Sequence, residues 1–280
     1  MDWEASVPPD FLELAKALAE DDIFFYPSNL GTDFTISTTK LQFIVYGDFE
    51  FAGKNIERAT GTVTEVRVLQ QVPTTIELCH VTDLSLDLHK LIKYALDSDV
   101  DGAAQYVFRG PDVFSGSAKP DIFSGFAGAD ALHGGDSNDR LYGGGGKDQL
   151  FGDTGNDRLF GGKGADRLDG GEGRDKLKGG KGPDVFVLSD GPGHGADKLV
   201  DWAPGETIEL DGTAFPGLTP GVLKGKFFHA GAHAKDADDH VLFAKGKIFF
   251  DGNGSEAGER SLVAKVAPGT SLHHDDFFVA

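Results

Sequence analysis

The chain has 280 residues and a formal net charge of −19, from 45 acidic and 26 basic residues. This acidic balance argues against a nucleic-acid partner, because phosphates would repel the chain. Cys79 is the only cysteine, which rules out an internal disulfide, and no apolar stretch is long enough for a membrane-spanning helix.

Residues 1–106 favour a small α+β domain. Capping signals and apolar faces predict helices at 8–22 and 84–99. Alternating patterns predict strands at 33–39, 41–51, 62–70 and 74–81. The domain is followed by the repeats of residues 107–190, which are typical of a solenoid. Because the end of a solenoid exposes an apolar core, the simplest role of the domain is to cap these repeats. The region contains no HExxH, GxSxG or phosphate-loop motif, so the sequence indicates no catalytic site.

Residues 107–190 contain an Asp every nine residues, and a Phe or Leu follows each Asp two residues later. The clearest copies read GGKGADRLD, GGEGRDKLK and GGKGPDVFV, in succession from residue 161. The glycine-rich part predicts a turn, and the last three residues predict a strand whose middle side chain points inward. The pattern resembles the nonapeptide GGxGxDxUx of RTX (hemolysin-type) calcium-binding repeat proteins. This resemblance implies a mainly β fold with a right-handed parallel β-roll, two nonapeptides forming each coil.

Such a roll would stack the Asp side chains in two columns. Asp130, Asp148, Asp166 and Asp184 would follow one edge, and Asp121, Asp139, Asp157 and Asp175 the other. Carboxylates separated by about 4.8 Å repel one another strongly unless a cation lies between them. The available donors are carboxylate and backbone oxygens, which suit several Ca²⁺ ions better than Zn²⁺ or Mg²⁺.

The resemblance also implies a ligand set. One turn gives the carbonyls of its second and fourth residues and its Asp, and the turn two repeats later gives the carbonyls of its first and third residues and its Asp. The first site joins Gly144, Gly146 and Asp148 with Gly161, Lys163 and Asp166. The second joins Asp153, Gly155 and Asp157 with Gly170, Glu172 and Asp175, and the third joins Gly162, Gly164 and Asp166 with Gly179, Lys181 and Asp184. Further metal ligands are expected at Asp130, Gly135, Ser137, Asp139, Gly152, Thr154, Gly171 and Gly173.

The first copies, residues 107–124, have lost most of their glycines, so we expect their calcium sites to weaken or vanish. Residues 191–280 resemble the segment that closes RTX rolls, where Asp197 and Asp201 are candidate ligands for a terminal calcium or else solvated turn acids. Residues 224–266 predict paired strands, and 251–259 only weakly match an EF-hand loop. The ending HHDDFFVA fits a secretion signal, a last edge strand, or both.

The resemblance implies a secreted, extracellular protein exported by type I secretion machinery without an N-terminal signal peptide, and folded by calcium outside the cell. Outward-facing Arg140, Tyr142, Arg158 and Phe160 suggest a surface for a glycan or cell-surface polymer, or a contact with a neighbouring domain. The alternatives are a small secreted hydrolase with its catalytic residues in 1–106, and a weak pore-forming toxin.

Overall fold

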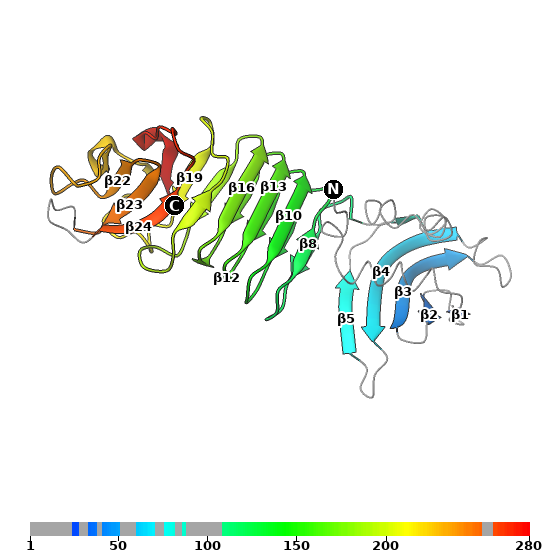
Figure 1. Ribbon diagram of the computed structural model, residues 1–280. Helices are drawn as coiled ribbons and strands as arrows, with labels where there is room; N and C mark the ends of the chain where they lie inside the picture. Colours follow the sequence, from blue (N-terminus) through cyan, green and yellow to red (C-terminus); the bar gives the residue numbers. More distant parts are fainter. Residues whose placement is uncertain are drawn as a thin grey trace. The chain divides into compact units, whose positions relative to one another are not determined.

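The computed structural model describes the backbone of six strands before residue 88, and residues 108–253 and 260–280 with their side chains. The described chain is mainly β and divides into two compact units, Met1–Arg109 and Gly110–Ala280 (Figure 1). In the described residues, no helix has the length and apolar character needed to cross a membrane.

The first unit contains an antiparallel sheet in the order β1-β2-β3-β4-β5. Its strands are β1 (Phe24–Pro27), β2 (Asp33–Ser37), β3 (Leu41–Glu50), β4 (Thr60–Gln70) and β5 (Ile76–Val81), and a short β6 (Leu86–Asp87) also pairs with β4. The four predicted strands are therefore confirmed. The prediction of a helix over 84–99 is wrong at Leu86–Asp87, which form β6; its remainder, and the predicted helix at 8–22, lie outside the described residues.

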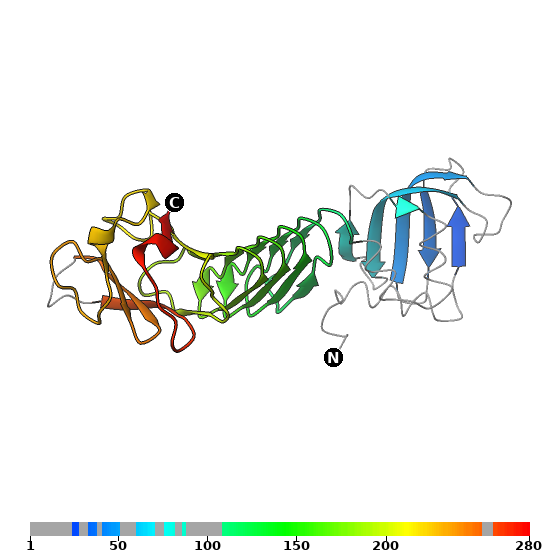
Figure 2. The ribbon, with the colours of Figure 1, turned by 90° about the horizontal axis from the view of Figure 1, so that it is seen from above.

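The second unit begins with a parallel roll made of two facing sheets, whose stacked coils are visible from above in Figure 2. We call them the β10 sheet and the β11 sheet. The β10 sheet contains β8 (Ile122–Ser124), β10 (Arg140–Gly145), β13 (Arg158–Lys163), β16 (Lys176–Lys181) and β18 (Asp197–Leu199). The β11 sheet contains β7 (Val113–Ser115), β9 (Ala131–His133), β11 (Gln149–Phe151), β14 (Arg167–Asp169), β17 (Val185–Leu188) and β19 (Thr207–Leu210).

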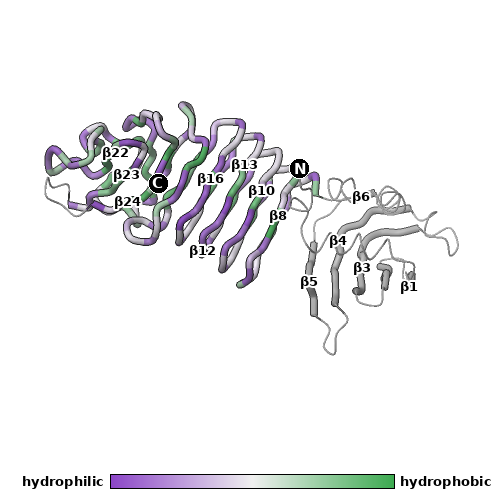
Figure 3. Tube along the Cα trace, in the orientation of Figure 1, coloured by the Kyte–Doolittle hydropathy of each residue, from purple (hydrophilic) through white to green (hydrophobic). Residues whose placement is uncertain are grey.

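The register of these strands confirms two nonapeptides per coil. Leu141 pairs with Leu159 and Leu159 with Leu177, each eighteen residues further along the chain. The middle residue of each strand points into the roll, because side chains alternate along a strand. The fully buried core column consists of Leu132, Leu141, Leu150, Leu159, Leu168, Leu177 and Phe186. In Figure 3, apolar colour recurs on the strands while hydrophilic colour dominates the turns between them.

The C-terminal segment closes the roll by extending both sheets. β24 (Arg260–Lys265) pairs with β18 and is followed in space by β23 (Lys247–Asp251), β22 (Val241–Ala244) and β21 (Phe228–His229). β25 (Phe277–Val279) pairs with β19 on one side and with β20 (Gly221–Val222) on the other. The predicted strand pairs are confirmed, but the expectation of a last edge strand is wrong, because β20 covers β25. Residues 254–259 of the EF-hand-like stretch lie outside the described residues.

Candidate metal centre

A chain of hydrogen bonds holds the aspartates in the two predicted columns. In the first Asp column, the backbone N–H of Asp130 donates to Oδ1 of Asp148 at 2.9 Å, and that of Asp148 donates to Oδ1 of Asp166 at 3.0 Å. This column consists of Asp112, Asp130, Asp148, Asp166 and Asp184, and the second Asp column of Asp121, Asp139, Asp157, Asp175 and Asp197. Each carboxylate after the first of its column is therefore held through Oδ1 by the coil that precedes it.

The second oxygen of almost every carboxylate is buried without a hydrogen-bond partner. These orphaned Oδ2 atoms belong to Asp112, Asp130, Asp139, Asp148, Asp157, Asp166, Asp175 and Asp184. Asp121 differs, because its Oδ2 accepts hydrogen bonds from the N–H and hydroxyl of Ser117 at 2.7 and 3.0 Å. A buried, unpaired carboxylate oxygen is costly, so these positions call for a positive partner that the protein itself does not supply.

Glycine at the first position of each turn keeps a space open beside that oxygen. A Cβ built on Gly161 would lie 2.5 Å from Oδ2 of Asp166 and 2.6 Å from the carbonyl oxygen of Gly179. A Cβ on Gly143 would lie at the same two distances from Oδ2 of Asp148 and the carbonyl oxygen of Gly161. The structure thus brings together a carboxylate and a first-position carbonyl in the first and third predicted sites, around a gap that any larger residue would fill.

The other predicted carbonyls lie in the same stacked turns. The carbonyl oxygen of Gly146 faces Gly164 of the next coil, where a Cβ would lie only 1.4 Å away. The third-position carbonyls of Lys163 and Lys181 accept hydrogen bonds from the N–H groups of Gly146 and Gly164, both at 2.8 Å. A carbonyl oxygen has a second lone pair, so this bond leaves room for a cation.

Positive φ angles explain the turn sequence. From Phe126 to Gly182, the second and fourth positions have φ between 63° and 157°, including two predicted ligands that are not glycine, Ser137 at 80° and Asp153 at 67°. The remaining predicted ligands occupy turn positions of the same coils, at Gly135, Gly144, Gly152, Thr154, Gly155, Gly162, Gly170, Gly171, Glu172 and Gly173. Their role as ligands stays a prediction.

Burial raises the pKa of the column carboxyls. The pKa of Asp130 rises to about 7, and those of Asp139, Asp157 and Asp166 to about 6, mainly because burial disfavours the charged form. Hydrogen bonds from the neighbouring backbone oppose this shift, and adjacent carboxylates in the same column add to it. Without a cation, ionisation of the columns at neutral pH therefore opposes folding.

Asp197 and Asp201, the two candidate ligands for a terminal calcium, both accept backbone hydrogen bonds, and their role as ligands stays a prediction. Asp197 is buried and accepts a hydrogen bond from the N–H of Asp175 at 2.9 Å, while Asp201 accepts from the N–H groups of Gly179 and Gly180 at 3.0 and 3.1 Å. The sequence analysis missed Glu206, which the β17–β19 register places beside Asp184 in the first Asp column. It is 7% exposed, and burial raises its pKa to about 7. Its position nine residues after Asp197 is the signal that could have found it.

The donor set fits calcium better than a transition metal. In residues 108–253 and 260–280, no group of three or more His, Cys, Asp or Glu side chains converges to hold a metal. Any cation between the coils must therefore combine the orphaned carboxylate oxygens with backbone carbonyls. Ca²⁺ accepts six to eight such oxygen ligands in flexible geometry, whereas Zn²⁺ prefers nitrogen and sulfur.

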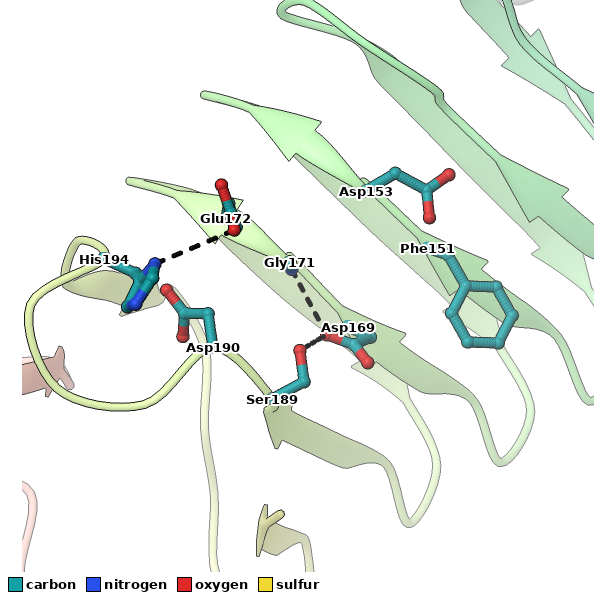
Figure 4. A pocket seen from close by; sticks show the side chains of 8 residues that line it. All are labelled: Phe151, Asp153, Asp169, Gly171, Glu172, Ser189, Asp190 and His194. Carbon is teal, nitrogen blue, oxygen red and sulfur yellow. Dashed lines mark hydrogen bonds and ion pairs between the residues drawn. The ribbon is translucent and has the colours of Figure 1, made fainter. Parts of the chain in front are cut away.

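A separate acidic pocket lies beside the turn that follows β17 (Figure 4). Its carboxylates are Asp153, Asp169, Glu172 and Asp190. Asp169 accepts a hydrogen bond from the Ser189 hydroxyl at 2.6 Å, and Glu172 lies 3.8 Å from a ring nitrogen of His194. Asp153 also accepts a hydrogen bond from the N–H of Gly135 at 3.2 Å, so groups of the protein engage three of these acids, unlike the orphaned oxygens of the columns.

The predicted ligand-binding residues share the outer face of the β10 sheet. Tyr142 and Phe160 stack on each other with ring centroids 4.8 Å apart and planes inclined by 7°. Both are half-buried, whereas Arg140 and Arg158 pair in register beside them and are exposed. Because the rings cover each other, the charged groups are the more accessible part of this surface.

Comparison with known proteins identifies the repeats. The family model of the RTX calcium-binding nonapeptide repeat (4 copies) matches residues 106–141, 124–159 and 151–186. No curated protein matches the chain.

Similar solved structures include the extracellular lipase LipA from Serratia marcescens, at 15% identity over 61% of this chain with a TM-score of 0.29. The match covers 38% of the lipase. The AlgE6R2 subunit of the mannuronan C5-epimerase from Azotobacter vinelandii is 21% identical over 61% of this chain and 89% of its own, with a TM-score of 0.29. The AlgE6R3 subunit of that enzyme is 24% identical over 60% of this chain and 78% of its own, with a TM-score of 0.18.

Proposed function

The chain carries RTX calcium-binding repeats in a parallel β-roll, and from this premise we propose that it is a secreted protein whose roll folds when extracellular calcium binds. The observation that carries the proposal is the row of buried, orphaned Oδ2 atoms, each of which, from Asp130 to Asp184, faces a space that glycine keeps open. Calcium in that space would neutralise the carboxylates and join one coil to the next.

The same arrangement explains why folding would depend on location. In a compartment with little calcium, the two columns repel and the repeats stay unfolded, which suits passage through a narrow export channel. Outside the cell, weak oxygen sites fill at about 10⁻⁴–10⁻³ M calcium. Because the site does not exist in the unfolded chain, binding and folding are one event.

Export would use the C-terminal end of the chain as a type I secretion signal. In the folded protein, Phe277 and Val279 are fully buried within β25. A signal at this position is therefore readable only while the chain is unfolded. Removal of residues 273–280 should abolish export from cells that supply a type I exporter, and unchanged export would contradict this part of the proposal.

We assign the folded roll to binding at an extracellular surface rather than to catalysis. The outward-facing Arg140 and Arg158 support a contact with a glycan or another surface polymer. The hydrolase alternative concerns residues 1–106, whose side chains lie outside the described residues. No observation on the described residues favours the hydrolase or the pore-forming alternative.

Far-UV circular dichroism during a calcium titration tests the central claim. We expect a cooperative gain of β signal in the millimolar range with calcium and none with magnesium, because magnesium retains its waters and demands rigid geometry. A spectrum that is already folded in chelator and indifferent to calcium would overturn the proposal.

A further inference from the structure

Six cations stand in register on the outer face of the β10 sheet. We call them the cation ladder: Arg140, Arg158, Lys176, Lys198, Lys265 and Lys247, carried in this order by β10, β13, β16, β18, β24 and β23. All six are exposed. The ladder crosses the boundary between the repeats and the C-terminal segment, so the sequence period reveals its first three members but not its last three.

The charges of the ladder are not neutralised by the protein. Within residues 108–253 and 260–280, none of its six members makes an ion pair or a side-chain hydrogen bond. The β11 sheet shows the contrast, because its outward-facing Arg167 makes two hydrogen bonds to Glu209, at 2.6 and 2.9 Å. Like charges directly opposite one another destabilise a sheet. The chain has 45 acidic residues that could have been placed opposite these cations to form ion pairs, so a row of unpaired cations indicates a role in binding.

The ladder presents a straight line of positive charge. Neighbouring strands are about 4.8 Å apart, so six strands span roughly 24 Å. The acids that directly precede four of these cations in sequence, Asp139, Asp157, Asp175 and Asp197, are buried in the second Asp column. The face is therefore locally positive although the chain as a whole is negative.

We propose that the cation ladder binds a linear acidic polysaccharide, whose carboxylates or sulfates lie along the line of Arg and Lys side chains. An extended sugar chain advances by about one strand spacing per residue, so its charges can meet successive rungs. Tyr142 and Phe160 lie two residues further along β10 and β13, and they offer apolar contact to the sugar rings. The equivalent place on β16 holds Lys178, and Val200 follows the end of β18. This proposal rests on the proposed function, since the ladder exists only in the folded roll.

A polysaccharide fits this surface better than a nucleic acid. The net charge of −19 disfavours a ligand as densely charged as a phosphodiester backbone. A polymer with at most one charge on each sugar meets less repulsion from the rest of the protein. Duplex DNA of similar length therefore serves as a competing ligand in the test.

The test compares two triple variants with the same change in net charge. The ladder variant is R158Q/K176Q/K198Q. The control variant is K119Q/K224Q/K235Q, which removes three exposed lysines that lie outside the ladder. Binding of a short oligouronate, a sulfated oligosaccharide, an uncharged glucan and duplex DNA is measured by calorimetry in saturating calcium, and circular dichroism establishes that each variant folds.

We expect the control variant to bind the oligouronate or the sulfated oligosaccharide with the same affinity as the wild type. Neither protein should bind the uncharged glucan. The ladder variant should bind roughly tenfold more weakly, the combined effect of three exposed ion pairs. The slope of log affinity against log salt should also fall by about one for each cation removed. Whichever acidic sugar binds more tightly identifies the charged group as carboxylate or sulfate.

The proposal is overturned if the ladder variant binds as tightly as the wild type, if both variants weaken equally, or if DNA binds more tightly than either acidic sugar. A wild-type protein that folds with calcium but binds neither acidic sugar refutes the ladder proposal and leaves the calcium-folding function standing. A protein that does not fold with calcium refutes the proposed function itself.

Discussion

The substitution Asp166→Asn separates the two roles of a column carboxylate. Its Oδ1 accepts a hydrogen bond from the N–H of Asp148 at 3.0 Å, and its Oδ2 is buried without a partner. Asparagine keeps the accepting oxygen and removes the negative charge. Its new N–H group can donate across the open space to the carbonyl oxygen of Gly179, which faces the same gap.

The expected effect of this substitution changes sign with calcium. Without calcium, the pKa of Asp166 rises from 3.8 to about 6, which opposes folding by at most about 3 kcal/mol at neutral pH. Solvent screening reduces this to about 1–2 kcal/mol, so Asp166→Asn should stabilise the calcium-free roll by that amount. With calcium, the variant loses a ligand shared by two predicted sites, and we expect it to be about 3 kcal/mol less stable than the wild type.

Two measurements on each protein test this reversal. In chelator, an osmolyte titration followed by circular dichroism gives the osmolyte concentration at the midpoint of folding, because osmolytes favour burial. A lower midpoint means a more stable calcium-free roll. In calcium, urea unfolding followed by the fluorescence of the buried Trp202 gives the free energy of unfolding. Asp236→Asn removes an exposed acid and should change neither result. A variant that folds less readily than the wild type in chelator, or is equally stable in calcium, would refute the reasoning.

Three further results are expected. Because burial raises the pKa of Asp130 to about 7, the calcium-free roll is most stable below about pH 4 and loses that stability as the pH rises through about 7. Folding in chelator should therefore need less osmolyte at pH ~5.5 than at pH ~7.5. The calcium concentration at the midpoint of folding should be higher at pH ~5.5, because protons compete with calcium for the carboxylates. Gly161→Ala should raise the calcium concentration at the midpoint of folding, because its Cβ fills the space beside the Asp166 carboxylate. The control is Gly110→Ala, whose Cβ meets no atom within 4 Å. Equal midpoints for the two variants would contradict the predicted site. Leu159→Ala should lower the free energy of urea unfolding in calcium by about 2–4 kcal/mol, because Leu159 is fully buried, and a loss below about 1 kcal/mol would contradict the packed core.

The repeats could be predicted almost completely from the sequence. Their Asp and Leu positions recur with the same period, so a single way of stacking the coils both buries the Leu side chains and forms the two Asp columns. Leu141, Leu159 and Leu177 pair as this stacking requires. The closing coil could not be predicted so fully. Lys198 of β18 pairs with Lys176 of β16, 22 residues earlier instead of eighteen, because the turn at 189–196 carries extra residues. This offset hid Glu206 as the next acid of the first Asp column.

The last three members of the cation ladder, Lys198, Lys265 and Lys247, and the interior position of β25 also escaped prediction. Lys198 meets Lys265 only because β24 docks beside β18, and that pairing depends on how a non-repeating segment folds back in space. Similarly, HHDDFFVA shows that a strand follows but not that β20 will cover it. Nonlocal pairing without a repeating pattern leaves little trace in the local sequence.

The coil length limits how the roll can become longer or shorter during evolution. Insertion or deletion of eighteen residues leaves each later Asp in its own column and each later strand in its own sheet. Insertion of a single nonapeptide before β18 would exchange the two sheets for everything downstream, and Lys198 would then leave the line of Arg140, Arg158 and Lys176. Repeats in such a chain should therefore be gained and lost in pairs.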